Sequence, residues 1–473
     1  MTTHTFLMLS KRALTAFALL CFVTRCSDEQ LIVNSTSTST STLTTTSGTT
    51  DLNDCSGCTY VVPAGATIID GQTLGLKPGA VIGLDAKVSY GMLTFRNING
   101  TIDQPIIIKN CGGTVRIDGT GKSSALKTQN SSYFRITGGD VKNSYGIVLT
   151  GGTITVSLGS LSNHFEVDHL EVQNSGFAGI MAKTDPGCDP ATWRQNFLMK
   201  GISLHHNYIH DTGGEGIYAG NSFFMGMDTP CGVQLPHEIH YIRIYSNTLK
   251  NTGWEAIQLG CATKGASIYG NVIENYGVAN KQAQNNGIQI GAGTGGVCYN
   301  NLIKGGTGNG MIIMGLADNI IYNNVIDHAG HYGIFCDERY SPGPGFQFIN
   351  NSIIDPGSDG IRLYADLVPM NVIMNNIITN PGSYATYTYP RTSADAFVYT
   401  ISNVKVQMVN NYFSETTESL QMPSLSVSNY SMSLTSPIID KGADISSYNI
   451  KTDFYYKPRL KGLAYDIGAV EQN

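Results

Sequence analysis

The chain has 473 residues, of which 14% are charged, and its formal net charge at pH 7 is −6. This mildly acidic balance excludes the basic patch on which nucleic-acid-binding proteins depend. Glycine is abundant, with 54 residues, and a chain rich in Gly, Asn and β-branched residues favours short strands joined by tight turns over a helical protein.

The first 26 residues form a predicted targeting segment. Its apolar run, residues 13–23, is too short to span a membrane. The run leads to Cys26, and residues 23–29 (VTRCSDE) resemble a bacterial lipoprotein signal. The resemblance implies an exported protein with a lipidated Cys26, held only by that anchor at the outer membrane, at the cell surface or facing the periplasm. Arg25 replaces the small residue usual before that cysteine, so ordinary signal-peptidase cleavage stays an alternative.

Residues 27–54 are predicted to be a linker, because Ser and Thr make up almost all of residues 35–50. Such a stretch has nothing apolar to bury and acts as a flexible tether. Cys55 and Cys58 follow with the C-x-x-C spacing of zinc ligands, but no second pair comes after them. We therefore expect a local disulfide between these two cysteines, or two buried thiols.

A repeat with a period of about 23 to 25 residues runs through the region 55–430. Each copy places apolar residues three positions before and two positions after an Asn, followed by a polar turn, a Gly and another apolar residue. The Asn column is Asn207, Asn247, Asn271, Asn301, Asn324, Asn351, Asn376 and Asn411. The apolar column after the Gly is Ile217, Ile257, Ile288, Met311, Ile334 and Ile361. Cys298 and Cys336 also fall on apolar columns, which predicts that both are buried.

The alternating apolar positions predict two short strands per repeat, each with one face inward. Stacked repeats place equivalent residues about 4.8 Å apart, so the apolar columns fill a core and the Asn side chains can hydrogen-bond along the stack. An antiparallel sandwich would need hairpin turns in place of a fixed period. The pattern therefore predicts an all-β solenoid.

Over about residues 60–415 the repeat resembles the right-handed parallel β-helix family, which includes polysaccharide lyases and glycoside hydrolases. The resemblance implies a solenoid with N- and C-terminal caps. Residues 100–108 look like a first coil, and residues 431–473 contain two stretches, 436–442 and 465–471, that resemble a closing segment. A cap is expected because an open last coil would expose apolar core and unpaired strand edges.

Two repeats carry insertions, at about residues 183–200 and 220–238. Both leave after the same strand, so we expect them to lie side by side as one wall. Cys188 lies in the first insertion and Cys231 in the second. We therefore predict a disulfide between them.

Glu215 and Glu255 occupy one turn position in adjacent repeats next to this wall. Neighbouring carboxylates raise one pKa, so one can serve as an acid and the other as a base or nucleophile, as in glycoside hydrolysis. Trp254 is placed to stack on a sugar ring, and His331 is a further acid–base candidate. Two alternatives remain: a solvated pair without a function, or a calcium site that includes Asp211.

The predicted substrate-binding residues beside Trp254 are Tyr218, Gln258, Gln289, Asp337 and Arg362. We therefore predict an extracytoplasmic monomer that hydrolyses a polysaccharide, with no cofactor indicated apart from that calcium. A polysaccharide lyase is the rival, but it would need cations around a uronate and a suitable base. A third alternative is a non-catalytic, glycan-binding or adhesive surface protein, because fold alone does not specify function.

Overall fold

The computed structural model describes residues 54–139, 145–340, 342–388, 390–422 and 429–472, all within one compact unit that begins at Asp51. The targeting segment, Cys26 and almost all of the linker lie outside the described residues, so lipidation and tethering stay predictions. Among the described residues, no helix is long and apolar enough to cross a membrane.

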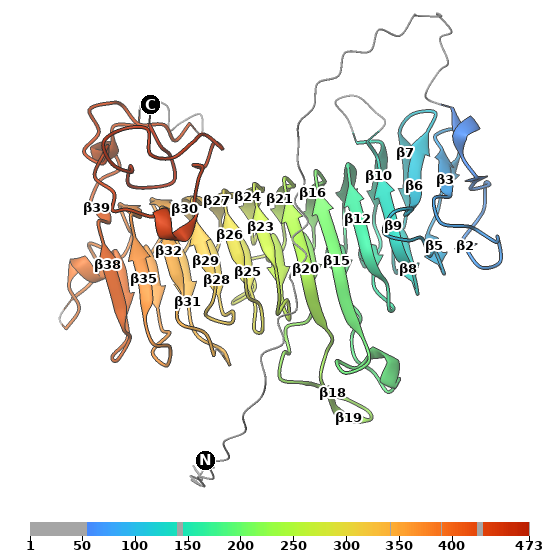
Figure 1. Ribbon diagram of the computed structural model, residues 1–473, viewed down its shortest axis with the longest axis horizontal. Coiled ribbons are helices and arrows are strands. Elements are labelled where there is room, and N and C mark those ends of the chain that lie inside the picture. Colours follow the sequence, from blue (N-terminus) through green and yellow to red (C-terminus); the bar gives the residue numbers. More distant parts are fainter. Residues whose placement is uncertain (1–53, 140–144, 341, 389, 423–428, 473) are drawn as a thin grey trace, which may run out of the picture. The chain divides into compact units, whose positions relative to one another are not determined.

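The described chain winds into stacked coils, and each complete coil adds one strand to each of three parallel sheets (Figure 1). The first sheet contains β1 (Tyr60–Val61), β3 (Val81–Asp85), β6 (Ile106–Cys111), β9 (Ser132–Thr137), β12 (Asn163–Asp168), β15 (Leu198–His205), β20 (Glu238–Tyr245), β23 (Ser267–Tyr269), β26 (Val297–Tyr299), β29 (Ile320–Tyr322), β32 (Gln347–Ile349), β35 (Asn371–Met374) and β38 (Val406–Val409). The second sheet contains β4 (Ser89–Tyr90), β7 (Val115–Asp118), β10 (Ile147–Thr150), β13 (Leu170–Gln173), β16 (Tyr208–Thr212), β21 (Thr248–Thr252), β24 (Val272–Tyr276), β27 (Leu302–Gly306), β30 (Val325–Ala329), β33 (Ser352–Ile354), β36 (Ile377–Thr379) and β39 (Tyr412–Ser414). The third sheet contains β2 (Ile68–Asp70), β5 (Leu93–Arg96), β8 (Leu126–Gln129), β11 (Ile154–Leu158), β14 (Ala178–Ala182), β17 (Ile217–Ala219), β22 (Ile257–Leu259), β25 (Ile288–Ile290), β28 (Met311–Ile313), β31 (Ile334–Cys336), β34 (Ile361–Leu363) and β37 (Val398–Thr400). This is the right-handed parallel β-helix that the repeat predicted. The prediction of two strands per repeat is wrong, because the ladder Asn lies at a corner that divides the first predicted strand into two, and each complete coil has three strands.

The core lies inside the coils, where the predicted apolar columns meet. Ile257 pairs in register with Ile217 on one side and Ile288 on the other, and all three side chains are fully buried. Cys298 and Cys336 are also fully buried, as predicted from their columns. Because every coil repeats the same inward positions, the core continues without a break along the stack.

The Asn column forms a hydrogen-bonded ladder at the corner between the first and second sheets. The backbone N–H and the side-chain amide of Asn301 both donate to Oδ1 of Asn324, at 3.1 and 2.9 Å. The same pair of bonds joins each ladder residue to the next from Asn207 to Asn411. The ladder thereby satisfies polar groups at a corner that is mostly closed to water.

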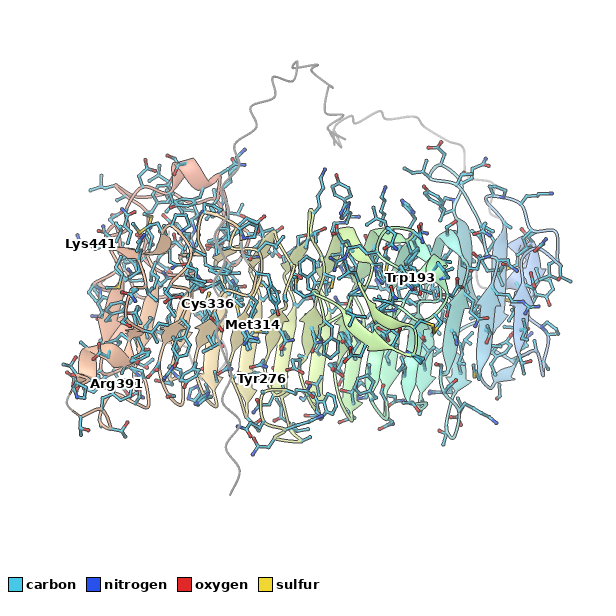
Figure 2. All side chains as sticks on the ribbon, turned by 90° about the horizontal axis from the view of Figure 1, so that it is seen from below. Trp193, Tyr276, Met314, Cys336, Arg391 and Lys441 are labelled. Carbon is cyan, nitrogen blue, oxygen red and sulfur yellow. A yellow bond between two sulfur atoms is a disulfide. The ribbon has the colours of Figure 1, made fainter. Side chains whose placement is uncertain are left out.

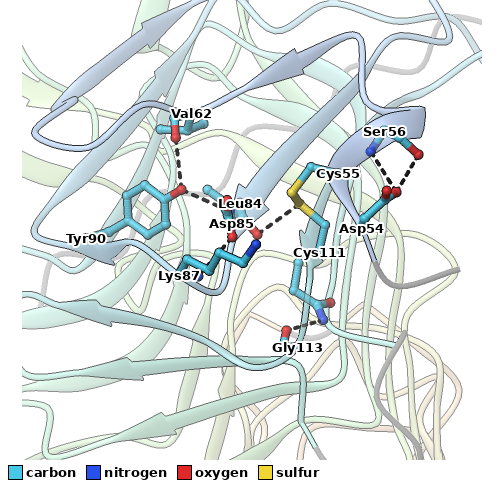
Figure 3. The surroundings of a disulfide bond; sticks show 11 residues. Asp54, Cys55, Ser56, Val62, Leu84, Asp85, Lys87, Tyr90, Cys111 and Gly113 are labelled. Atoms are coloured by element: carbon cyan, nitrogen blue, oxygen red, sulfur yellow. Dashed lines mark hydrogen bonds between the residues drawn. A yellow bond between two sulfur atoms is a disulfide. The ribbon is translucent and has the colours of Figure 1, made fainter. Parts of the chain in front are cut away.

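The N-terminal end starts earlier than expected and is tied by a disulfide. Residues 100–108 lead into β6, the third strand of the first sheet, and are therefore not the first coil. Cys55, in the 3₁₀ turn η1 (Cys55–Gly57), pairs with Cys111 at the end of β6 (Figure 3). The predicted local Cys55–Cys58 disulfide is therefore wrong, because the stacking of β1, β3 and β6 brings Cys111 to Cys55 from 56 residues away.

The described part of the C-terminal segment lies along the side of the coils. The expected cap over the open end of the last coil is not what this part of the segment forms. Its Ile438, Ile467 and Val470 pack against residues of the second sheet. Met408 and Phe413 of the last coil, which stand in core columns, stay 54% and 36% exposed. In Figure 2, Lys441 of this segment and Arg391 of the loop before β37 lie on opposite sides of the last coils.

The segment is held by a second set of asparagines, each of which directly precedes a ladder Asn. Asn300 and Asn323 donate their side-chain amides to the carbonyls of Asp453 and Thr452, at 2.9 and 2.7 Å. Asn350, Asn375 and Asn410 donate in the same way to carbonyls of residues 441–468. These outer asparagines have positive φ angles of 47–55°, which turn their side chains away from the ladder.

Candidate active site

The two insertions form one wall beside the third sheet, as predicted. The first contains the 3₁₀ turn η2 (Pro190–Thr192), and the second contains the hairpin of β18 (Met227–Thr229) and β19 (Gly232–Gln234), which extends beyond the ends of β15 and β20 (Figure 1). The predicted disulfide Cys188–Cys231 joins them. Arg194 of the first insertion also donates to the carbonyls of Phe224 and Pro236 in the second, at 2.5 and 2.9 Å. The wall is therefore a fixed part of the face.

Glu215 and Glu255 occupy adjacent coils, as expected, but they are buried instead of solvated. The N–H of Gly216 donates to the carbonyl of Glu255 at 3.0 Å, which places the two residues in neighbouring positions. The exposed fractions of Glu215 and Glu255 are 2% and 0%. Burial raises the pKa of each carboxyl to about 7. Oε2 of each residue has no hydrogen-bond partner, which is a costly state for a buried oxygen.

The turn position that the pair occupies continues as a row of amides. Asn286 donates to Oε1 of Glu255 at 2.9 Å, and Asn309 donates to Oδ1 of Asn286 at 2.8 Å. Nδ1 of His331 lies 3.1 Å from Oδ1 of Asn309. The row connects the buried Glu255 to His331 through two asparagines, so these two residues, both predicted to be catalytic, lie three coils apart.

Aromatic and cationic side chains surround the pair. The ammonium group of Lys281 lies 3.4 Å from the centroid of the Trp254 ring, and its charge acts to lower the pKa of both Glu215 and Glu255, against the larger effect of burial. The ammonium group of Lys183 lies 4.4 Å from the Tyr218 ring. Trp254 is therefore engaged by a cation as well as by the edge of a neighbouring ring, Phe177.

Two cavities open on the third-sheet face. The first, of about 320 Å³, lies under the insertion wall, and two of its lining residues are the predicted binding residues Gln258 and Gln289. The amide of Gln258 donates to the hydroxyl of Ser222 at 2.7 Å, and Phe223 and Met225 on the wall are more than half exposed. The second cavity, of about 560 Å³, is lined by Asn286, Asn309, His331, Tyr332 and Phe335 among others. Amides and aromatic rings thus line both.

The predicted residues Arg362, Asp337 and Asp211 are not among the residues that line these two cavities. Arg362 pairs with the buried carboxylate of Asp359 at 3.0 Å and lies against the Tyr399 ring, at 4.4 Å. Asp337 pairs with Arg339 at 3.3 Å. Asp211 accepts hydrogen bonds from Asn251 and His210, at 2.9 and 2.6 Å, and belongs to no described group of three His, Cys, Asp or Glu donors close enough to share one ion. The structure therefore divides the predicted site among several places.

A cluster on the outer face of the first sheet was missed. Glu166, Asp168 and His205 lie there together with Arg135. The sequence contains a signal for this cluster. Glu166 and Asp168 are two residues apart in one strand and therefore share a face, and Asp168 pairs in register with His205 of the strand in the next coil.

Comparison with known proteins agrees with the architecture. Residues 231–413 match the family model described as "Right handed beta helix region". A search of curated proteins found no match. Similar solved structures include pectate lyase Pel9A, with 12% identity, coverage of 89% of this chain and 99% of the other, and a TM-score of 0.48. Others are a PL6 family polysaccharide lyase from Pseudopedobacter saltans (11% identity, 86% and 99% coverage, TM-score 0.38) and the catalytic unit of a GH87 α-1,3-glucanase from Streptomyces thermodiastaticus (12% identity, 75% and 64% coverage, TM-score 0.44). The three parallel sheets show the right-handed β-helix fold, and residues 231–413 carry the sequence pattern of the matched family model.

Proposed function

We propose that this protein is a carbohydrate-active enzyme that hydrolyses a neutral or weakly charged polysaccharide bound on the third-sheet face. The observation that carries the proposal is the burial of two carboxyl groups in adjacent coils, each with a pKa of about 7 and an unpartnered oxygen. Perturbed carboxyls of this kind concentrate at catalytic sites. The amide-lined and aromatic-lined cavities beside them offer the groups that hold sugar hydroxyls and sugar rings.

The two carboxyls take different roles in this proposal. Asn286 donates to Glu255, and a donor of this kind favours the ionised form. Glu255 is therefore the base, and Glu215 is the acid that protonates the leaving glycosidic oxygen. The bond between the anomeric carbon and that oxygen breaks while Glu255 takes a proton from the attacking water, whose hydroxyl bonds to the anomeric carbon. Transfer of this proton from Glu255 to Glu215 restores both carboxyls to their starting state. Substrate reaches the pair only when the side chains that bury it move, and Lys281, on the loop that lines the larger cavity, is the candidate for this movement.

Elimination by a lyase mechanism is less well supported on this face. A lyase requires cations that neutralise a uronate carboxylate. The cations here are already engaged, since Lys183 pairs with Asp185 at 3.0 Å, Lys281 lies on Trp254 and Arg362 pairs with Asp359. The engaged cations favour a neutral glycan over an acidic one.

The matched test is the pair of variants Glu215→Gln and Glu255→Gln on a panel of polysaccharides, with the release of reducing ends and the absorbance of unsaturated uronates both recorded. We expect each variant to lose at least about a hundredfold in turnover, because an amide can neither donate nor accept the proton. The melting temperature of each variant should be at least as high as that of the wild type, because the neutral amide replaces a buried ionisable group.

Gln284→Ala provides a control, because Gln284 lies on the Lys281 loop but belongs neither to the pair nor to the residues that line the larger cavity. Near wild-type turnover by both Gln variants would show that the pair is a structural continuation of the amide row. Unsaturated products would show that the reaction is an elimination.

We also propose that the protein works outside the cytoplasm, attached through Cys26. The two disulfides, Cys55–Cys111 and Cys188–Cys231, support this location, because disulfides persist in oxidising compartments and are rare in the cytosol.

A further inference from the structure

The outer face of the first sheet brings nitrogen and oxygen donors together at a place separate from both cavities. Glu166 and Asp168 lie on β12, and His205 ends β15 on the next coil. One donor atom from each of these residues lies within 4.8 Å of the other two. Nε2 of His205 is 3.3 Å from Oε1 of Glu166, a separation that two ligands of one small ion adopt.

A cation already occupies the space between the two carboxylates. Nε of Arg135 lies 2.7 Å from Oδ1 of Asp168 and 3.0 Å from Oε1 of Glu166. The Asp168 side chain is fully buried, whereas the Arg135 side chain is 39% exposed and borders solvent. The carboxylates thus attract positive charge to a fixed point, and the group that supplies it has room to swing outward.

The far side of each buried donor is held by a further residue. Oδ2 of Asp168 accepts from the Thr137 hydroxyl at 2.7 Å and lies 2.6 Å from Nδ1 of His169. Nδ1 of His205 lies 2.8 Å from Nδ1 of His206, and the His205 ring stacks on Tyr245 with centroids 4.5 Å apart. Outer contacts of this kind fix the orientation of metal ligands and raise metal affinity.

We propose that Glu166, Asp168 and His205 bind one divalent transition-metal ion, Zn²⁺ in preference to Ca²⁺, and that the ion displaces the Arg135 guanidinium. An imidazole nitrogen with two carboxylates is a donor set that suits Zn²⁺, whereas Ca²⁺ takes oxygen ligands alone. The two negative charges of the carboxylates also balance the charge of a divalent ion, whereas the single positive charge of Arg135 neutralises only one of them. The site lies on the outer face of the first sheet, whereas Glu215 and Glu255 precede strands of the third sheet. Metal binding at this site therefore does not depend on the proposed hydrolysis.

The test is titration of the EDTA-treated, full-length protein with ZnCl₂ by calorimetry, followed by Co²⁺ titration read as visible absorbance. We expect one Zn²⁺ per chain and much weaker binding of Ca²⁺. Glu166→Gln and His205→Gln should each weaken Zn²⁺ binding by at least about tenfold. His328→Gln is the control, because His328 also lies beside two carboxylates, Asp327 and Asp355, and its removal should leave the affinity unchanged.

Arg135→Gln gives the sharper result. Removal of a competing cation should tighten Zn²⁺ binding, whereas a purely structural ion-pair cluster would show no binding in either protein. Far-UV circular dichroism checks the fold, and the Glu166 side chain is exposed enough, at 36%, for its substitution to leave the fold intact. The proposal is overturned if the wild type binds no stoichiometric Zn²⁺, if Glu166→Gln and His205→Gln bind as the wild type does, or if Arg135→Gln fails to tighten binding.

Discussion

Glu215 and Glu255 contribute to stability in a way that changes with pH. Each carboxyl has an ordinary pKa near 4.5 when the chain is unfolded and a pKa of about 7 when it is buried in the fold. Below pH 4.5 both states hold the proton and there is no penalty. As the pH rises from 4.5 to 7, the unfolded chain ionises freely and the folded chain does not, so the free energy of unfolding falls. Above pH 7 the loss is complete, at roughly 3 kcal/mol for each group.

We therefore expect the melting temperature of the wild type to fall between pH 5 and pH 7.5 more steeply than that of the double variant Glu215→Gln/Glu255→Gln. The difference between the two curves isolates the pair, because other titrating groups are common to both. His237 is one of them, and burial lowers its pKa to about 4, so it acts in the opposite direction. Differential scanning calorimetry across this pH range measures the effect, and parallel curves for the two proteins would contradict it.

At the level of elements, the two adjacent asparagines at each corner from Asn300 onward have different roles. In the pair Asn300 and Asn301, Asn301 belongs to the buried ladder, while Asn300 turns outward and donates to the carbonyl of Asp453. The inward Asn stabilises the stack of coils, and the outward Asn holds the C-terminal segment against it. Adjacent residues of the same type therefore provide a matched comparison.

Asn301→Ala should lower the free energy of unfolding of the whole β-helix by about 1–3 kcal/mol, because the N–H and side-chain amide of Asn271 lose their acceptor inside the corner. Asn300→Gly, which removes the side-chain amide and tolerates the positive φ at this position, should leave global unfolding almost unchanged and should increase hydrogen exchange in residues 451–456. Chemical denaturation and hydrogen-exchange mass spectrometry distinguish the two effects. Equal losses of global stability in both variants would refute the division of roles.

The elements also show what the sequence could predict. The inward columns and the Cys188–Cys231 disulfide were accessible because they follow from a fixed period, which aligns equivalent residues in successive coils. The burial of Glu215 and Glu255 could not be predicted, because it depends on how side chains from other coils and from an irregular loop pack over these two carboxyls. The position of the C-terminal segment could have been found from the Asn-Asn doublets, which begin at Asn300 and occur in each later coil of the ladder.

On the scale of the whole molecule, the targeting segment gives the prediction that is easiest to test. Cys26→Ser should move the protein from the membrane fraction to the soluble fraction, because the acyl chains on that cysteine supply the attachment. Fractionation of cells followed by immunoblotting measures the distribution. Cys21→Ser, at the second lipidation candidate in the targeting segment, is the control and should leave the protein in the membrane fraction. Continued partition of Cys26→Ser with membranes would show that another feature attaches the protein.

The lateral position of the C-terminal segment has a consequence for how this protein can change in evolution. A lid over the last coil would contact that coil alone. Here the anchors of the segment are spread over consecutive corners from Asn300 to Asn410. A coil duplicated upstream of Asn300 would leave every one of these anchors in place. The number of coils upstream of Asn300 can therefore change during evolution while the C-terminal segment keeps the same contacts with the coils that follow.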